Sequence, residues 1–360
     1  MPATGLDPFA SRLPITIITG FLGSGKTTLL SRLLRHPGMN RAAVIINEFG
    51  EVGLDHELVE ASNEQMMLLA NGCLCCTVRT DLQETLRELF VRRRRGEVID
   101  FDRVFIETTG LADPAPVLHS LASDGLLGAQ YRLNGVVTLV DAVNGFDSLD
   151  TMAEAAKQAA LADRLIITKS DIAPAAVVDR LRQRLQSMNP YALVAIAVAG
   201  ELDPEQLMNI APTNLSSLSA EPNRWLSASE PALSSVADGD KVSNASTHSS
   251  QSSHDAAIQS YCLWFDRPFT WEALNASLQV LTALRGQDLL RVKGIINVAG
   301  EAGPVAIHGV QHIFHPPVKM DRWHSDERRS RIVFIVRNIP RPAIEALFGA
   351  VGVLSGVRGG

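Results

Sequence analysis

The sequence contains no apolar run long enough to span a membrane. Its first twelve residues also lack the basic-then-apolar plan of a secretory signal. Neither sign of charge dominates, because 33 Lys and Arg face 39 Asp and Glu, for a net charge of −6. That balance gives no electrostatic reason to expect nucleic acid or an anionic membrane as a partner. We therefore expect a cytoplasmic protein with neither of these partners.

Cysteine is also scarce, with four in 360 residues. Cys73, Cys75 and Cys76 fall within four consecutive positions, which excludes a disulfide framework for a chain of this size. Thiolates are soft ligands that favour Zn²⁺ or Cu(I) over Mg²⁺ or Mn²⁺. The cluster therefore indicates metal or redox chemistry. A partly buried structural cluster is the alternative.

The chain is longer than one hydrophobic core usually serves, so we expect two domains. In the first part, apolar runs of strand length alternate with helical periodicity, which is typical of a parallel sheet with helices on both faces. An α/β fold with right-handed crossovers is therefore predicted there. The expected strands are 15–19, 42–46, 103–106, 136–140, 165–168 and 192–199, and 66–70 is a further apolar run.

Residues 212–257 are rich in Ser, Asn, Asp and Pro and have few large apolar side chains. Such a segment buries too little surface to offset its ordering entropy, which predicts a flexible linker. We therefore expect an α/β domain over 1–211, this linker, and a small α+β domain over 258–360. In the last part, strands are expected at 260–265, 289–298, 305–314 and 331–336, and helices at 271–284 and after Pro340.

A phosphate-binding loop is predicted where the motif G-x-x-x-x-G-K-T lies between an expected strand and a helical pattern at 29–34. Its backbone N–H groups and the start of the helix would bind anionic phosphates. Lys26 would reach the β/γ-phosphates, and the Thr27 hydroxyl would bind Mg²⁺. The alternative is a glycine-rich turn with a surface lysine. The residues expected to contact the nucleotide are Gly20, Gly23, Ser24, Gly25, Lys26, Thr27 and Thr28.

Glu107 and Gly110 follow the expected strand 103–106. The carboxyl ends of strands are where open α/β sheets bind ligands. With Lys26, these two residues are the predicted catalytic residues: Glu107 would support the Mg²⁺ shell and orient water, and Gly110 would sense the γ-phosphate. A capping or core-edge carboxylate is the alternative for Glu107.

The segment from Thr168 to Asp171 resembles the base-recognition segment of GTP-binding domains. Asp171 would accept two hydrogen bonds from guanine, while the stem of Lys169 would lie against the base. Adenine lacks that pair of donors, so GTP is the predicted nucleotide. A helix N-cap is the alternative for this segment.

Together with two further motifs, these segments resemble the CobW-type metal-chaperone GTPases, relatives of the UreG and HypB maturation GTPases. The resemblance implies a GTPase that carries a transition metal at the C-x-C-C segment and gives it to a client apo-metalloprotein. The further motifs are Asn47-Glu48-Phe49-Gly50-Glu51 and Gly72-Cys73-Leu74-Cys75-Cys76, and the C-terminal matches are Arg291 to Gly294, His308 to His312, Trp323 and Arg328 to Arg331.

Cys75 and Cys76, then Cys73, are the favoured metal ligands. A tetrahedral zinc site needs four ligands, and Glu51, Glu48 or a client residue would complete it, with Glu51 the leading oxygen ligand. The thiols are expected on a loop entering a helix, whose dipole would lower their pKa values. Ordering of the neighbouring loops by GTP would then change the metal geometry.

Several alternatives remain open at this level. Zn²⁺ ranks ahead of Co²⁺ on ligand softness and abundance, and a cobalt-handling protein of corrinoid synthesis or a metal-enzyme activator is the first alternative. A metal-storage or sensing module is the second, and a small-molecule kinase lacks a recognisable acceptor motif. A nucleotide- or metal-dependent homodimer is also open. The C-terminal histidines His308, His312 and His315 are expected on a polar surface or at a client contact, and the linker histidines His248 and His254 are expected in solvent.

Overall fold

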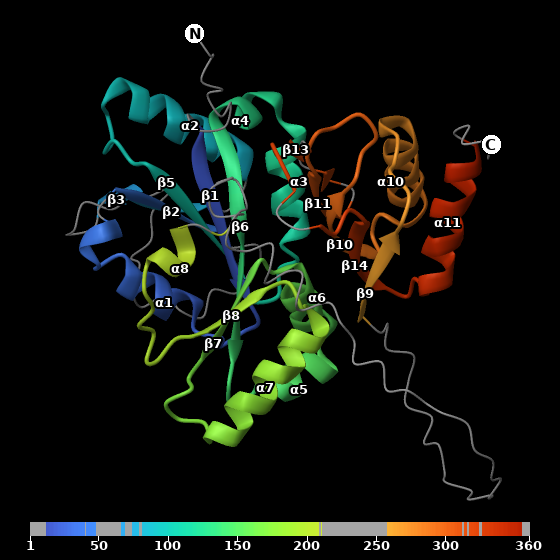
Figure 1. The fold of residues 1–360 in the computed structure, drawn as a ribbon. Coiled ribbons are helices and arrows are strands. Elements are labelled where there is room, and N and C mark those ends of the chain that lie inside the picture. The colour runs from blue at the N-terminus through green and yellow to red at the C-terminus, as the bar shows by residue number, and fades with distance from the viewer. Residues whose placement is uncertain are drawn as a thin grey trace, which may run out of the picture.

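The computed structural model describes residues 12–39, 41–47, 66–68, 74–78, 81–208, 210, 258–311, 313–314, 317–323 and 326–354. These residues form two β-sheets, one from the N-terminal and one from the C-terminal part of the sequence, each with packed helices (Figure 1). The predicted α/β part followed by a smaller α+β part is therefore confirmed. The expected linker at 212–257 lies outside the described residues.

Strand β1 (Leu13–Gly20) lies inside an eight-stranded sheet of order β3-β4-β2-β5-β1-β6-β7-β8. Its neighbouring pairs are all parallel except β3 with β4. Buried Ile and Val dominate the inner strands, as expected for a parallel sheet covered on both faces. The other strands are β2 (Ala42–Asn47), β3 (Met66–Leu68), β4 (Leu74–Val78), β5 (Arg103–Thr108), β6 (Tyr131–Asp141), β7 (Arg164–Thr168) and β8 (Leu193–Ile196).

Helices cover both faces of this sheet. Helices α1 and α8 pack on one face, and α2, α6 and α7 pack on the other. No helix in the described ranges is long and apolar enough to cross a membrane. The helices are α1 (Lys26–Leu33), α2 (Leu82–Arg95), α3 (Ala115–Ser123), α4 (Gly125–Gln130), α5 (Gly145–Thr151), α6 (Ala153–Leu161), α7 (Ala175–Met188) and α8 (Glu205–Met208), with a 3₁₀ turn at Pro37–Met39.

The C-terminal sheet is antiparallel and has the order β12-β11-β10-β14-β9, with β13 also paired to β11. One of its faces packs on α10 and α11, and the other lies against α3 and α6 of the first domain (Figure 1). Its elements are β9 (Ile258–Phe265), α10 (Trp271–Arg285), β10 (Leu289–Ile296), β11 (Val305–Val310), β12 (Ile313–Phe314), β13 (Val318–Lys319), β14 (Ser330–Arg337) and α11 (Arg341–Leu354).

The two domains share a hydrophobic core. Leu290, Val310 and Ile335 of the C-terminal sheet belong to the same buried cluster as Leu118 and Leu161 of the first domain. Burial of apolar surface at this contact stabilises one relative orientation of the domains. The C-terminal domain is therefore packed directly on the helices of the sheet that carries the phosphate loop.

One expected strand is in fact a hairpin. The pattern at 305–314 predicts a continuous strand, but β11 ends at Val310 and β12 folds back to pair with it antiparallel. Gln311 has φ 53°, in the left-handed region that an extended strand does not contain. A change of backbone direction that includes Gln311 therefore separates two apolar runs that periodicity alone joins.

Candidate functional site

The phosphate loop leaves β1 in the conformation that its glycines allow. Gly20 has φ 144°, and an added Cβ would lie 2.4 Å from Leu139 O; Gly25 has φ 88°. Helix α1 then begins without a side-chain cap and without an acidic residue in its first turn. By contrast, Asp81, Asp124 and Thr270 cap α2, α4 and α10. The uncapped N–H groups and the unpartnered, buried Ser24 Oγ fit a bound phosphate.

Lys26 lies folded over this loop. Its Nζ donates to Gly20 O at 2.8 Å and to Phe21 O at 3.3 Å. Burial lowers the pKa of the Lys26 ammonium, and the nearby Glu107 carboxylate opposes that shift. A buried cation whose hydrogen bonds go to neutral carbonyls is positioned to accept further negative charge.

Thr27 and Glu107 bring two oxygen donors together next to the loop. The Thr27 hydroxyl donates to Glu107 Oε1 at 2.8 Å, across 80 residues of sequence. Hard oxygen ligands of this kind are what Mg²⁺ prefers, together with phosphate oxygens. Glu107 lies on β5 and accepts this bond from a side chain of α1, and it caps none of the helices in the described ranges. The two side chains therefore fit a magnesium ion bound with a nucleotide.

Gly110 touches the phosphate loop from the opposite side. An added Cβ would lie 2.8 Å from Leu22 N and Cα and 2.6 Å from Leu22 Cδ2. Such distances are shorter than any van der Waals contact, so only glycine allows this approach. The segment that follows Glu107 is thus packed directly on the loop.

The substitution Gly110→Ala is expected to lower kcat/KM for GTP hydrolysis about 10- to 100-fold, because displacing the loop by a fraction of an ångström misaligns the reacting groups. Gly128→Ala on α4 is the control, since a Cβ there meets no atom within 4 Å. Steady-state phosphate release measures both variants. Equal rates for Gly110→Ala and Gly128→Ala would contradict the role of this contact.

The segment predicted to bind the base lies beside the same loop. The Thr168 hydroxyl donates to Ser24 O at 2.8 Å, and Lys169 adopts a left-handed φ of 56°. Lys169 Nζ donates to Asp141 Oδ2 at 2.7 Å. Burial alone would raise the pKa of Asp141, but hydrogen bonds from Lys169, Val143 N–H and Asn144 hold it below its usual value. Asp141 therefore fixes the lysine that is predicted to lie against the base.

Asp171 is exposed in the turn between β7 and α7. Helix α7 begins only at Ala175, its N-cap residue is Pro174, and no side chain caps it. The alternative of a helix N-cap at Asp171 is therefore wrong. No hydrogen bond joins its carboxylate to another residue in the described part of the chain, which leaves both oxygens available to a ligand.

Strand β4 contains two of the three clustered cysteines. Cys75 and Cys76 are in register with Val44 and Ile45 of β2, and β3 pairs with β4 on its other side. The expectation of a loop entering a helix is wrong here, because α2 begins six residues after Cys76 and is capped by Asp81. A helix dipole acts within about one turn, so the dipole argument does not apply. Cys73, Glu48 and Glu51 lie outside the described residues.

The structure adds residues that the sequence motifs do not contain. Asp141 ends an expected strand, so its position at the ligand edge was foreseeable, but its pairing with Lys169 was not. Gln158 and the Ala199-Gly200 turn beside Thr28 have no sequence signal of this kind. His308 is half-buried, with Nε2 3.0 Å from Arg291 Nη2, rather than on an open polar surface. His312 and His315 lie outside the described residues.

Known proteins resemble this chain over nearly its whole length. It is 33% identical over 340 residues to the zinc chaperone YjiA of Escherichia coli, covering 94% of this chain and 98% of that protein. It is 31% identical over 371 residues to the zinc chaperone CobW of Pseudomonas aeruginosa, covering 93% and 90%. A crystal structure of Zn(II)-bound YjiA GTPase from E. coli matches with a TM-score of 0.70 and 30% identity, over 94% of this chain and 99% of that one.

Two family models account for the two domains. The model described as CobW/HypB/UreG, nucleotide-binding domain matches residues 14–195, which include the phosphate loop, Glu107 and Asp171. The model described as cobalamin synthesis protein cobW C-terminal domain matches residues 258–351, which form the antiparallel sheet with α10 and α11. With this arrangement of domains and these relatives, the chain belongs to the CobW family.

Proposed function

We propose that this chain is a GTP-hydrolysing zinc chaperone, which holds the metal at its C-x-C-C segment and transfers it to client apo-metalloproteins. Relatives spanning nearly its whole length are named zinc chaperones. The observation that carries the proposal is the register of the sheet: Ile46 of β2 lies between Thr77 of β4 and Glu107 of β5. The residue after Cys76 is thus two strand spacings, about 10 Å, from the proposed catalytic acid.

GTP hydrolysis needs neutralised charge and an oriented water more than covalent help. In this proposal Lys26 contacts the β/γ-phosphates, and the first turn of α1 donates N–H groups to them. Thr27 and Glu107 would hold Mg²⁺ beside the phosphates, and the ion would supply positive charge where negative charge develops. Glu107 and Gly110 position the water that attacks the γ-phosphorus, and the bond to the bridging oxygen breaks to give GDP and phosphate.

Base selection follows from the exposed turn after β7. Asp171 accepts from the two guanine donors, and the stem of Lys169, held by Asp141, lies against the ring. ATP would leave the Asp171 acceptors unmet, which is a costly mismatch once water is excluded. GTP is therefore the proposed substrate.

The metal is cargo in this proposal. Cys75, Cys76 and Cys73 are the proposed thiolate ligands, and Glu51, Glu48 or a client residue completes the set. An incomplete protein ligand set favours exchange with a client, and thiolates require a reducing compartment such as the cytoplasm. Glu107 lies on β5, and β4 and β5 both pair with β2. A displacement of Glu107 at the γ-phosphate is therefore transmitted to the metal segment through one intervening strand.

The substitution Cys75→Ser is expected to weaken Zn²⁺ binding by at least about 100-fold. Loss of a residue that only supports a metal ligand weakens binding by up to about 100-fold, and Cys75 is a proposed ligand itself. Anaerobic titration with Zn²⁺ and with Co²⁺ measures it, and GTP hydrolysis is followed in the same samples. The proposal expects basal hydrolysis to persist while its response to metal disappears.

The control is Cys262→Ser, at the one cysteine of the C-terminal domain. Burial raises the pKa of the Cys262 thiol to about 11, so it is protonated at neutral pH and a poor metal ligand. Zinc stoichiometry should be unchanged in this variant. The same stoichiometry in Cys75→Ser would overturn the chaperone proposal, and metal affinity independent of GTP would favour a storage protein.

A further inference from the structure

Helix α6 makes hydrogen bonds to the segment that follows Glu107. Gln158 is 1% exposed, and its Nε2 donates to Gly110 O at 3.2 Å and to Ala112 O at 2.9 Å. One residue earlier, Lys157 Nζ forms an ion pair with Asp113. Since Gly110 also packs against the phosphate loop, α6 and the loop hold this segment from its two sides.

Burial of the Gln158 amide at this position carries a free-energy penalty. Its Oε1 is buried and has no hydrogen-bond partner among the described residues. A methionine of similar length would fill the space without an unsatisfied oxygen, which costs about 1–3 kcal/mol. The two donated hydrogen bonds are therefore what the residue contributes, and both end on the backbone between Gly110 and Ala112.

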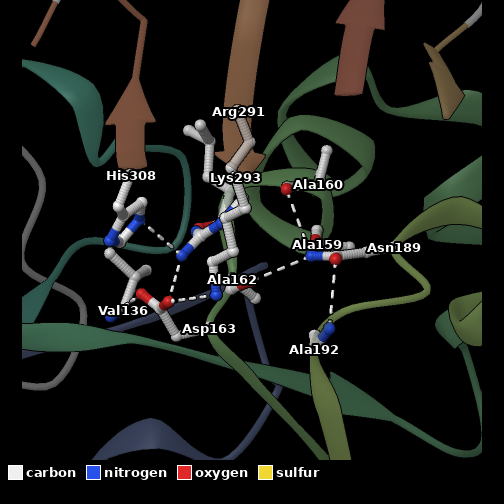
Figure 2. Close-up of polar contacts among 11 residues, drawn as sticks. Val136, Ala159, Ala160, Ala162, Asp163, Asn189, Ala192, Arg291, Lys293 and His308 are labelled. Atoms are coloured by element: carbon white, nitrogen blue, oxygen red, sulfur yellow. Dashed lines mark hydrogen bonds and ion pairs between the residues drawn. The ribbon is translucent and has the colours of Figure 1, made fainter. Parts of the chain in front are cut away.

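The other end of α6 is held partly by the C-terminal domain (Figure 2). Arg291 of β10 donates to Leu161 O, the carbonyl of the last residue of α6, and forms an ion pair with Asp163. Asn189 of the first domain donates hydrogen bonds to the neighbouring carbonyls at this end of α6. They are Ala159 O, Ala160 O and Ala162 O, at 3.0, 3.1 and 2.9 Å from Asn189 Nδ2.

We propose that Gln158 is a positioning residue for GTP hydrolysis, and that Arg291 of the C-terminal domain sets its position through α6. Leu161 lies three positions after Gln158, so about one helical turn joins the two contacts. A shift of the C-terminal domain at Arg291 moves this turn, and the Gly110 to Ala112 backbone moves with it. The inference rests on the proposed binding of GTP at the phosphate loop.

The substitution Gln158→Met is expected to lower kcat about 10- to 100-fold, because the segment after Glu107 loses its alignment. KM for GTP should change less than about twofold, since no contact to the nucleotide is removed. The matched control is Asn134→Leu. Asn134 is also a buried amide, with bonds to Thr16 Oγ1 and Leu207 O but none to this segment. It should lose stability in urea and keep kcat.

The link to the C-terminal domain is tested with Arg291→Lys, which keeps the charge near Asp163 but loses the fork that also reaches Leu161 O. Combined with Gln158→Met, it should lower kcat little further than Gln158→Met alone, because both act on one contact. If the losses of kcat in the two single variants multiplied in the double variant, the link through α6 would be overturned. A kcat for Gln158→Met equal to that of Asn134→Leu would overturn the positioning role. If the wild type hydrolyses no GTP, the proposed function itself fails.

Discussion

Replacement of Lys26 by methionine is expected to lower kcat/KM for GTP hydrolysis about 1,000-fold, the upper range for removing one preorganised donor from a transition state. Residue Lys26 is 8% exposed and its ammonium donates to Gly20 O and Phe21 O, so it has lost most of its hydration before GTP arrives. A charge desolvated in advance interacts strongly with the γ-phosphate as negative charge develops there. Steady-state phosphate release with GTP and Mg²⁺ measures the effect.

Stability separates this loss from misfolding. Because burial lowers the pKa of Lys26, the charged form costs folding free energy at neutral pH. Removing the charge offsets the two lost hydrogen bonds, so the unfolding free energy of Lys26→Met should lie within about 1 kcal/mol of wild type. Lys319→Met, at a mostly exposed lysine of the C-terminal domain, should keep full activity. Activity of Lys26→Met within tenfold of wild type would contradict the assigned site.

The nucleotide half of the site was predictable because its residues are tied to local backbone requirements. Gly20 and Gly25 need conformations that few other residues adopt, and Lys26 and Thr27 follow in fixed order at the start of α1. A parallel sheet brings the ends of β1, β5 and β7 to one edge, so strand order along the chain was enough to gather Glu107 and Asp171 near the loop.

Other features depend on contacts between distant residues, for which the sequence has no local pattern. Gln158 contacts Gly110 across 48 residues, and Arg291 contacts Asp163 across 128. The C-x-C-C segment was expected to be a loop because it lies between an apolar run at 66–70 and a helical pattern that begins at Leu82. Pairing with β2 and β3 makes Cys75 and Cys76 part of a strand instead, so tertiary contacts decide the structure of this short segment.

Asp163 joins the two domains through a cluster of buried charges (Figure 2). Its side chain is 2% exposed and lies against Arg291 and Lys293 of β10, while its Oδ2 accepts from Val136 N at 3.0 Å. Burial alone would raise the pKa of Asp163, but Arg291, Lys293 and His308 outweigh it and hold the pKa well below its usual range. The carboxylate is therefore a counterion for two buried cations.

The isosteric substitution Asp163→Asn should cost about 3–5 kcal/mol of unfolding free energy, because it leaves buried cations without their counterion. Glu345→Gln is the matched control. It breaks the exposed pair with Arg341, which should contribute less than about 1 kcal/mol. Urea unfolding at pH 7 measures both, and equal losses would show that the interface cluster contributes no more than a surface pair.

The pH dependence of unfolding tests the contribution of the Asp163 charge independently. Since the folded-state pKa of Asp163 is depressed, its contribution is complete above the unfolded-state value of about 3.9 and is lost as pH falls below it. Asp163→Asn has no such proton to take up. The stability difference between wild type and Asp163→Asn should therefore be constant from pH 7 to about 5 and narrow below pH 4. A difference that stays constant down to the acid transition would mean that lost packing, rather than the lost charge, destabilises the variant.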